Sequence, residues 1–291
     1  MSLNKYQQFC YRRLGRYAEK KQREKLQKSL AAAHMNIRAS AYVSYAILTS
    51  LFVFMVTFLV FLFLIVLFTF VLNIQLDMFL MLLFLLLPVL SGLGTYGGML
   101  SSPGSKAKGR GKKIDSVLPY ATNFIAVMSS AGVTPTEIFK SLSKQDIYGE
   151  VKEEASWIYR DIGMLGSDVI TAIKTNIVRT PSLKFKEFLQ GLVVTVTSGG
   201  SLKTYFMSKA DQYMRENRQM QKQLLETLGI MAESYVTAAV AGILMLLIVI
   251  PLMMMISNSF DANFLYVLVF GLVPIVHFGF AGIIKLMIQG G

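Results

Sequence analysis

Four long apolar runs divide the chain, and polar segments lie before and between them. The runs cover residues 42–72, 78–100, 235–256 and 264–284, and none contains Asp, Glu, Lys or Arg. About 20 apolar residues cross the hydrocarbon core of a bilayer as a helix. Only short polar stretches separate the members of each pair, so the pattern predicts an all-α integral membrane protein with four transmembrane helices in two hairpins.

The segment between the hairpins contains the helix start and stop signals of a soluble helical bundle. Gly132 and the Ser198–Gly200 stretch are typical helix stops, while Thr134–Pro135 and Thr180–Pro181 are typical helix starts. The apolar positions after Thr180 recur at i, i+3 and i+4, which predicts a helix with one buried face. These positions are Leu183, Phe185, Phe188, Leu189, Leu192, Val193 and Val196.

We therefore expect a bundle of about six helices. The predicted helices cover 115–131, 134–144, 148–164, a short helix starting at Ser167–Asp168, and 180–198. A last, long helix is expected to begin at the N-cap Ser201 and to continue into the third span, because only Gly229 interrupts it.

These patterns predict five regions. They are a basic cytoplasmic N-terminal arm (1–41), a first transmembrane hairpin (42–100), a basic Gly/Ser linker with a flexible exit at 101–105 (101–113), the helical bundle (114–234), and a second hairpin with a short cytoplasmic tail (235–291).

The basic residues predict the orientation of the chain in the membrane. Hydrophobic residues make up 54% of the sequence, yet its net charge is +12. All 29 Lys and Arg residues lie before the first run, between the two pairs, or after the last run. Because Lys and Arg concentrate on the cytoplasmic side, we expect both termini and the bundle to be cytoplasmic, in a multi-pass protein of the cell membrane.

No arrangement of residues indicates catalysis or a cofactor. The sequence lacks a Walker-type phosphate-binding loop and a His-Glu-x-x-His metal motif. Glu153 and Glu154 are interpreted as part of a solvated face, His277 as a hydrogen-bonded packing residue, and Cys10 as an incidental thiol. The stretch 198–201 is more typical of a turn between helices than of a phosphate site. We expect no enzymatic activity, no metal and no cofactor.

A cluster of basic residues precedes the bundle and leaves several interpretations open. Its members are Lys106, Lys108, Arg110, Lys112 and Lys113. Anionic lipids and an acidic protein partner both fit such a segment, whereas nucleic acid is not expected because aromatic residues are not interleaved. A transporter or channel with a cytoplasmic regulatory bundle is an alternative for the whole chain, but polar residues are sparse in its spans. A membrane enzyme is a second alternative without a visible catalytic cluster.

An ordered set of motifs resembles the type II secretion F-domain family. These are the platform proteins of type IV pili, the archaellum and related secretion machines, and the sequence is closer to the archaeal members. The motifs are Val117–Asn123 with Pro119, Ser130–Pro135 with Gly132 and Pro135, Arg160–Ile162 followed by Gly166–Asp168, Arg179–Ser182 with Pro181, and Thr197–Leu202 with Gly199 and Gly200.

The resemblance implies a membrane platform that binds a cytoplasmic hexameric ATPase and helps to lift pilin or archaellin subunits into a filament. The single bundle implies a homodimer, or a heterodimer with a second platform subunit. It leaves open which filament is built. The basic cluster and the N-terminal arm are then candidate docking segments for the motor.

Overall fold

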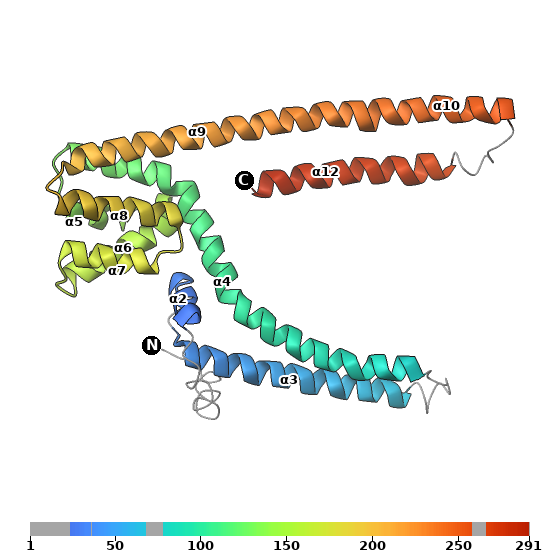
Figure 1. Cartoon of the computed structure of the whole chain (residues 1–291), viewed down its shortest axis with the longest axis horizontal. Helices are drawn as coiled ribbons and strands as arrows, with labels where there is room; N and C mark the ends of the chain where they lie inside the picture. The colour runs from blue at the N-terminus through green and yellow to red at the C-terminus, as the bar shows by residue number, and fades with distance from the viewer. Residues whose placement is uncertain (1–23, 36, 68–77, 258–265, 291) are drawn as a thin grey trace. The chain divides into compact units, whose positions relative to one another are not determined.

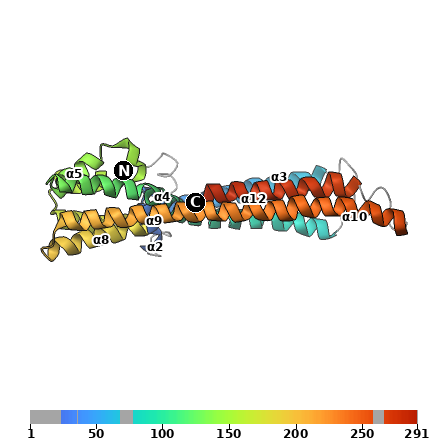
Figure 2. The ribbon, with the colours of Figure 1, turned by 90° about the horizontal axis from the view of Figure 1, so that it is seen from above.

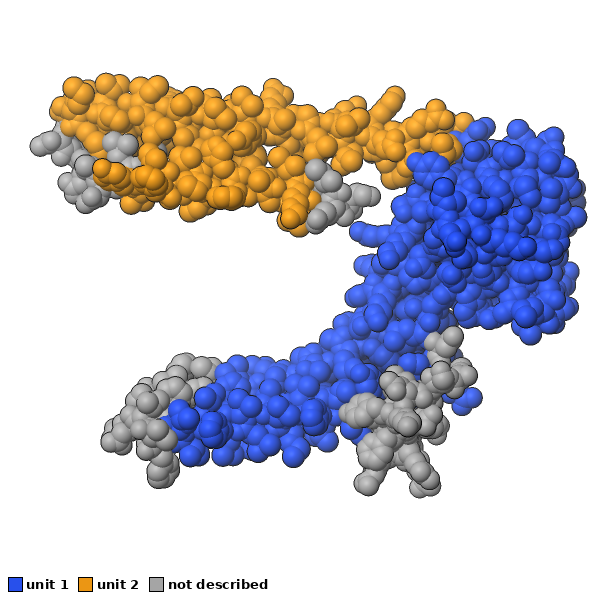
Figure 3. All heavy atoms as spheres, turned by 180° about the vertical axis from the view of Figure 1, so that it is seen from behind, with its two compact units in different colours: residues 1–211 blue, residues 212–291 orange. Residues whose placement is uncertain are grey.

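The computed structural model describes residues 24–35, 37–67, 78–257 and 266–290 (Figure 1). Within these ranges the chain is helical and has no strand, which confirms the all-α prediction. The chain divides into two compact units, residues 1–211 and 212–291 (Figure 3). Some residues of the sequence analysis lie outside the described ranges. These are Cys10, the predicted hairpin connection 73–77 and most of the connection 257–263.

The first unit contains a helical hairpin, α3 (Ala39–Val66) and α4 (Met78–Ser130). The hydroxyl oxygens of Thr57 and Ser91 lie 3.0 Å apart across the two helices. The Tyr42 hydroxyl donates to the Met99 carbonyl at 2.8 Å. Residues 39–66 are long and apolar enough to cross a membrane, whereas the second predicted span, at the start of α4, remains a prediction.

Helix α4 corrects the predicted linker. It is continuous for 53 residues, so residues 101–113 are helical and no flexible exit exists at 101–105. The glycines and prolines of this stretch suggested a break because both disfavour helix interiors. One face of the stretch is buried, however, and this tertiary packing outweighs local propensity. The buried positions are Pro103, Ala107 and Gly111, and Ile114 and Leu118 continue this face after the stretch.

The bundle packs against the second half of α4. It consists of α5 (Pro135–Leu142), a 3₁₀ turn η2 (Asp146–Tyr148), α6 (Gly149–Gly163), α7 (Val169–Arg179), α8 (Leu183–Thr197) and the first turns of α9 (Leu202–Ser234). Helix α8 buries most of its predicted apolar face, although Leu183 is exposed. The largest fully buried side chains of the bundle are Ile114, Leu118, Ile125, Ile138, Phe139, Leu142, Ile158, Ile173, Phe185, Phe188 and Phe206.

Two glycines end helices as predicted. Gly132 and Gly199 have φ values of 80° and 69°, which glycine adopts without a Cβ clash. In each case the next residue donates its N–H back to the helix, Val133 to Met128 and Gly200 to Thr195, which completes a Schellman motif.

The predicted helix starts are only partly correct. Thr134 occupies the N-cap of α5 but makes no side-chain capping bond. Ser182, not Thr180, caps α8, and its hydroxyl accepts from the Phe185 N–H at 2.9 Å. Asp168 caps α7, as predicted.

The second unit contains the remainder of α9 and a second pair of helices. Helix α9 passes through a π-helical segment η3 (Tyr235–Ala241) into α10 (Gly242–Ser257), so one helix runs over Leu202–Ile256 as predicted (Figure 2). A short π-helical segment η4 (Leu268–Leu272) leads into α12 (Val273–Gly290). Residues 202–256 and 269–286 contain further apolar stretches long enough to cross a membrane.

The predicted packing role of His277 is confirmed in this unit. Its Nδ1 lies 2.8 Å from the carbonyl oxygen of Val273, one turn earlier on α12. The Tyr235 ring meets the His277 ring edge-on at 5.7 Å and the Phe280 ring at 5.4 Å.

Candidate functional site

A buried ion-pair cluster joins α4 to α6 and to helix α2 (Glu24–Ala32). The side chain of Arg110 is only 10% exposed, and each of its guanidinium nitrogens has a partner. Its Nε donates to Glu150 at 2.8 Å, its Nη2 to Glu154 at 2.9 Å, and its Nη1 to the Ala32 carbonyl at 2.6 Å. Arg110 therefore connects three segments that lie far apart in the sequence.

Burial controls the charge state of this cluster. The side chain of Glu154 is 1% exposed, and burial raises the pKa of its carboxyl even though Arg110 acts in the opposite direction. The pKa of His34 is lowered to about 4, first by burial and then by the charge of Arg110. His34 Nε2 lies 3.8 Å from Glu154, but at neutral pH this imidazole is uncharged and the contact is no ion pair.

The only tryptophan of the chain lies beside the cluster. The guanidinium groups of Arg160 and Arg179 lie 4.3 Å and 4.2 Å from the centre of the Trp157 ring. The His34 ring is 4.9 Å away at a tilt of 42°. Both arginines also approach the buried Asp161, Arg160 at 3.0 Å and Arg179 at 3.9 Å. Cation–π contacts and ion pairs thus hold α6, α7 and the segment after α2 together.

The predicted site residues separate into two groups. Lys106, Lys108, Lys112 and Lys113 are exposed on α4, on either side of its buried face. Arg110 belongs instead to the buried cluster, so it is not available at the surface. The interpretation of Glu154 as a solvated residue is wrong, because it is the partner of Arg110.

Sequence reasoning missed the Trp157 cluster, although it noted most of its members. Arg160, Asp161 and Arg179 all belong to the motifs that carried the family resemblance. Their spacing could have indicated a shared site, because Trp157 and Asp161 lie one turn apart on a helix.

The other motif residues have structural positions. Pro119 is buried within α4, Pro135 begins α5, and Gly166 has a φ of 64° after α6. A Cβ on Gly111 would lie 3.0 Å from the carbonyl oxygen of Pro181, so α4 meets the turn before α8 closely. Gly199 and Gly200 form the turn into α9, consistent with the interpretation of 198–201 as a turn.

Among the residues that the structure describes, no group of three or more His, Cys, Asp or Glu side chains could hold a metal ion. The charged residues of the site pair with one another and bury most of their surface. The arrangement is suited to holding helices in place.

These features define a helical domain whose last helix continues into an apolar membrane-length segment. Residues 121–250 match the family model described as type II secretion system (T2SS), protein F. This match is the resemblance that the ordered motifs predicted, and this part of the chain is called the F domain below. Members of this family are membrane platform proteins.

Two curated proteins of Methanocaldococcus jannaschii are similar to the chain. An uncharacterized protein is 35% identical over 132 residues, which is 45% of this chain and 22% of that protein. Flagella accessory protein J is 25% identical over 184 residues, which is 62% of this chain and 32% of that protein. The chain thus covers no more than about a third of these relatives' length. The similarity supports a relationship to the archaeal platform family of type IV filaments. No solved structure matches the chain.

Proposed function

We propose that the chain is a membrane platform for a type IV filament, and that it couples a cytoplasmic hexameric ATPase to the extraction of pilin or archaellin subunits. The observation that carries the proposal is the helix over Leu202–Ile256. It begins in the F domain and ends in an apolar segment of membrane length. A force on the domain would reach the membrane through continuous backbone hydrogen bonds rather than through a flexible linker.

The orientation of the chain follows from its charges. With all Lys and Arg outside the apolar runs, the F domain and both termini lie in the cytoplasm, where the motor is. Lys106, Lys108, Lys112 and Lys113 are the candidate docking residues for an acidic surface of the motor, and Arg110 is not one of them. The single F domain is completed by a second copy or by a second platform subunit.

Breaking the helix between the domain and the membrane tests the coupling. Gly229 is exposed in α9, and a Cβ at this position meets nothing within 4 Å. Gly229→Pro removes a helix hydrogen bond and introduces a clash that costs about 3 kcal/mol or more, whereas Gly229→Ala favours the helix. In cells that depend on this chain for a filament, Gly229→Pro should abolish assembly while membrane insertion and ATPase binding persist.

Gly229→Ala is the matched control and should assemble filaments normally. Normal filaments with Gly229→Pro would refute mechanical coupling through this helix.

A further inference from the structure

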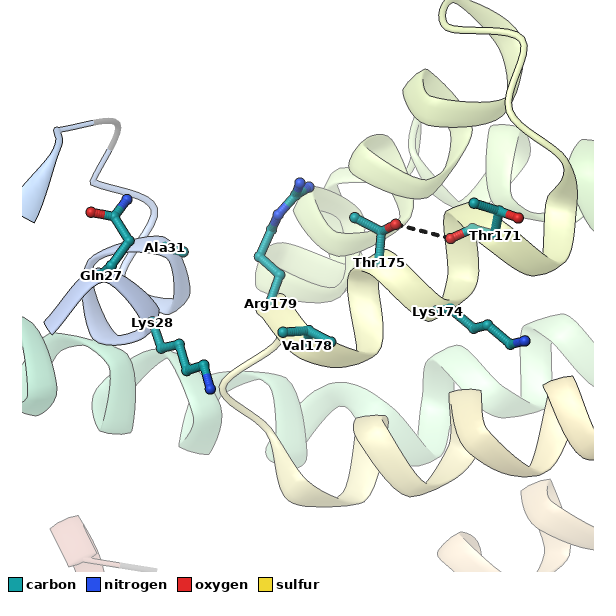
Figure 4. A pocket seen from close by; sticks show the side chains of 8 residues that line it. All are labelled: Gln27, Lys28, Ala31, Thr171, Lys174, Thr175, Val178 and Arg179. Atoms are coloured by element: carbon teal, nitrogen blue, oxygen red, sulfur yellow. Dashed lines mark hydrogen bonds between the residues drawn. The ribbon is translucent and has the colours of Figure 1, made fainter. Parts of the chain in front are cut away.

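A groove between α2 and α7 lies beside the Trp157 cluster and shares Arg179 with it (Figure 4). It has a volume of about 540 Å³, within the usual range of small-molecule sites. Helix α2 contributes Gln27, Lys28 and Ala31, and α7 contributes Thr171, Lys174, Thr175, Val178 and Arg179.

The charge of the groove is one-sided. Its lining includes Lys28, Lys174 and Arg179 but no acidic residue. Lys28 and Lys174 are exposed, and neither forms an ion pair with a residue that the structure describes. The guanidinium of Arg179 points away from both lysines, stacks on Trp157 and approaches Asp161, so Lys28 and Lys174 supply the free positive charge of the groove. The groove therefore favours an anion.

The groove is also partly apolar. Val178 is 69% exposed, and Ala31 lies opposite it on α2. The aliphatic stems of the lysines add to this surface, since long basic side chains cover apolar area while their charged ends reach water. An amphiphile with an anionic head fits this lining better than a small hydrophilic anion does.

The groove lies next to the start of the first membrane-length helix. Gln27, one of its lining residues, accepts a hydrogen bond from the N–H of Ala39 at 2.8 Å, and Ala39 is the first residue of α3. Leu26 and Leu30 of α2 form a core cluster with Tyr42 and Val43 of α3. A helix that packs on the first turns of a span lies at the level of lipid headgroups.

From this combination we infer that the α2–α7 groove binds the headgroup of an anionic phospholipid. The phosphate lies between the two helices, attracted by Lys28 of α2 and Lys174 of α7, and the glycerol and first methylenes lie against Ala31 and Val178. Bound lipid would fix α2 against the F domain at the membrane surface. Basic pockets on the cytoplasmic side of membrane proteins commonly bind such headgroups. The inference does not depend on the ATPase or the filament.

The test measures lipid binding by the full chain in detergent with native mass spectrometry. Phosphatidylglycerol should bind more tightly than phosphatidylcholine. The double variant Lys28→Gln/Lys174→Gln should weaken the first phosphatidylglycerol about 30-fold, because each basic residue contributes about 1 kcal/mol near anionic lipid and 1.4 kcal/mol is tenfold. Lys144→Gln/Lys203→Gln removes two exposed lysines elsewhere in the same unit and should leave affinity unchanged.

A second variant separates a built site from general charge attraction. Ala31→Trp keeps every charge but fills the groove, and it should also lose tight phosphatidylglycerol binding. Inorganic phosphate, tested as a competitor at millimolar concentration, should not displace the lipid. Any one of four results would overturn the inference. These are equal affinity for the two lipids, full lipid binding by Ala31→Trp, an equal loss of affinity in the two double-lysine variants, and displacement of the lipid by inorganic phosphate.

Discussion

Replacing Arg110 by Met tests whether the buried cluster holds the F domain together. Met has similar length and no charge, so the substitution removes three interactions while it preserves most of the packing volume. Glu154, at 1% exposure, loses its main counter-ion, and the Ala32 carbonyl loses its donor. The consequence should be a large loss of stability without a change of fold.

The structure sets the magnitude of this loss. Breaking a buried ion pair by removing one partner costs about 3–5 kcal/mol, since the remaining charge stays buried. The pKa of Glu154 is already raised, so its carboxyl can take up a proton and relieve part of the cost. We therefore expect about 3 kcal/mol, which corresponds to a fall in Tm of roughly 6–12 °C for a unit of the size of residues 1–211.

The fluorescence of Trp157 is a direct assay. It is the only tryptophan, and it lies within contact distance of the cluster, so its emission during heating reports the loss of this region. The measurement uses the full chain in detergent. Lys108→Met is the matched control: it removes an exposed basic residue from the same helix and should melt within about 2 °C of the wild type.

The double variant Arg110→Met/Glu154→Met gives the sharper discrimination. With both charges gone, only the partly exposed Glu150 is left without its partner, and most of the lost stability should return. The reasoning is refuted if Arg110→Met melts with the wild type, or if the double variant is less stable than the single one.

Three further predictions concern single residues. The pKa of His34 is about 4 in the folded state and 6.5 in the unfolded state, so the unfolded state binds more protons between these two pH values. Acidification from pH 6.5 to 4 should therefore destabilise the wild type relative to His34→Gln. An equal fall in Tm for the two proteins across this pH range would contradict the prediction. Gly199→Ala should destabilise the protein by about 1 kcal/mol because the φ of Gly199 is 69°. Gly109→Ala should instead stabilise it by up to about 1 kcal/mol, because Gly109 lies in an exposed turn of α4 with free space around it. Thermal melts in which both variants shift the Tm in the same direction would contradict one of these two predictions. Gly111→Ala should destabilise the protein, since the new Cβ would lie 3.0 Å from the Pro181 carbonyl oxygen. A Tm equal to that of Gly109→Ala would show that the turn at Pro181 moves away without cost.

The all-α fold class and the ends of helices in the bundle could be predicted from the sequence, because both depend on local chemistry. The spacing of apolar residues indicated α8, and glycines with positive φ ended helices at Gly132 and Gly199. The continuity of α9 into an apolar segment of membrane length also followed from the absence of a strong helix breaker. The ordered motifs identified the F domain, which the family match confirms.

The remaining features depend on contacts between distant segments. Propensity alone predicted a linker at 101–113, but the buried face of α4 keeps it helical. Arg110 looks like its lysine neighbours in the sequence, and only the approach of α6 and α2 turns it into a buried residue. The same approach makes Glu154 a buried partner. The groove between α2 and α7 likewise needs the tertiary arrangement to be seen.

The most direct test of the platform proposal is to purify the full chain from its own membranes and identify the co-purifying proteins by mass spectrometry. The proposal predicts a hexameric secretion-type ATPase together with pilin-like subunits. Lys108→Glu/Lys112→Glu should lose the ATPase, while Lys144→Glu/Lys203→Glu should retain it. A preparation without ATPase that conducts solutes in liposomes would contradict the platform function and favour a transporter.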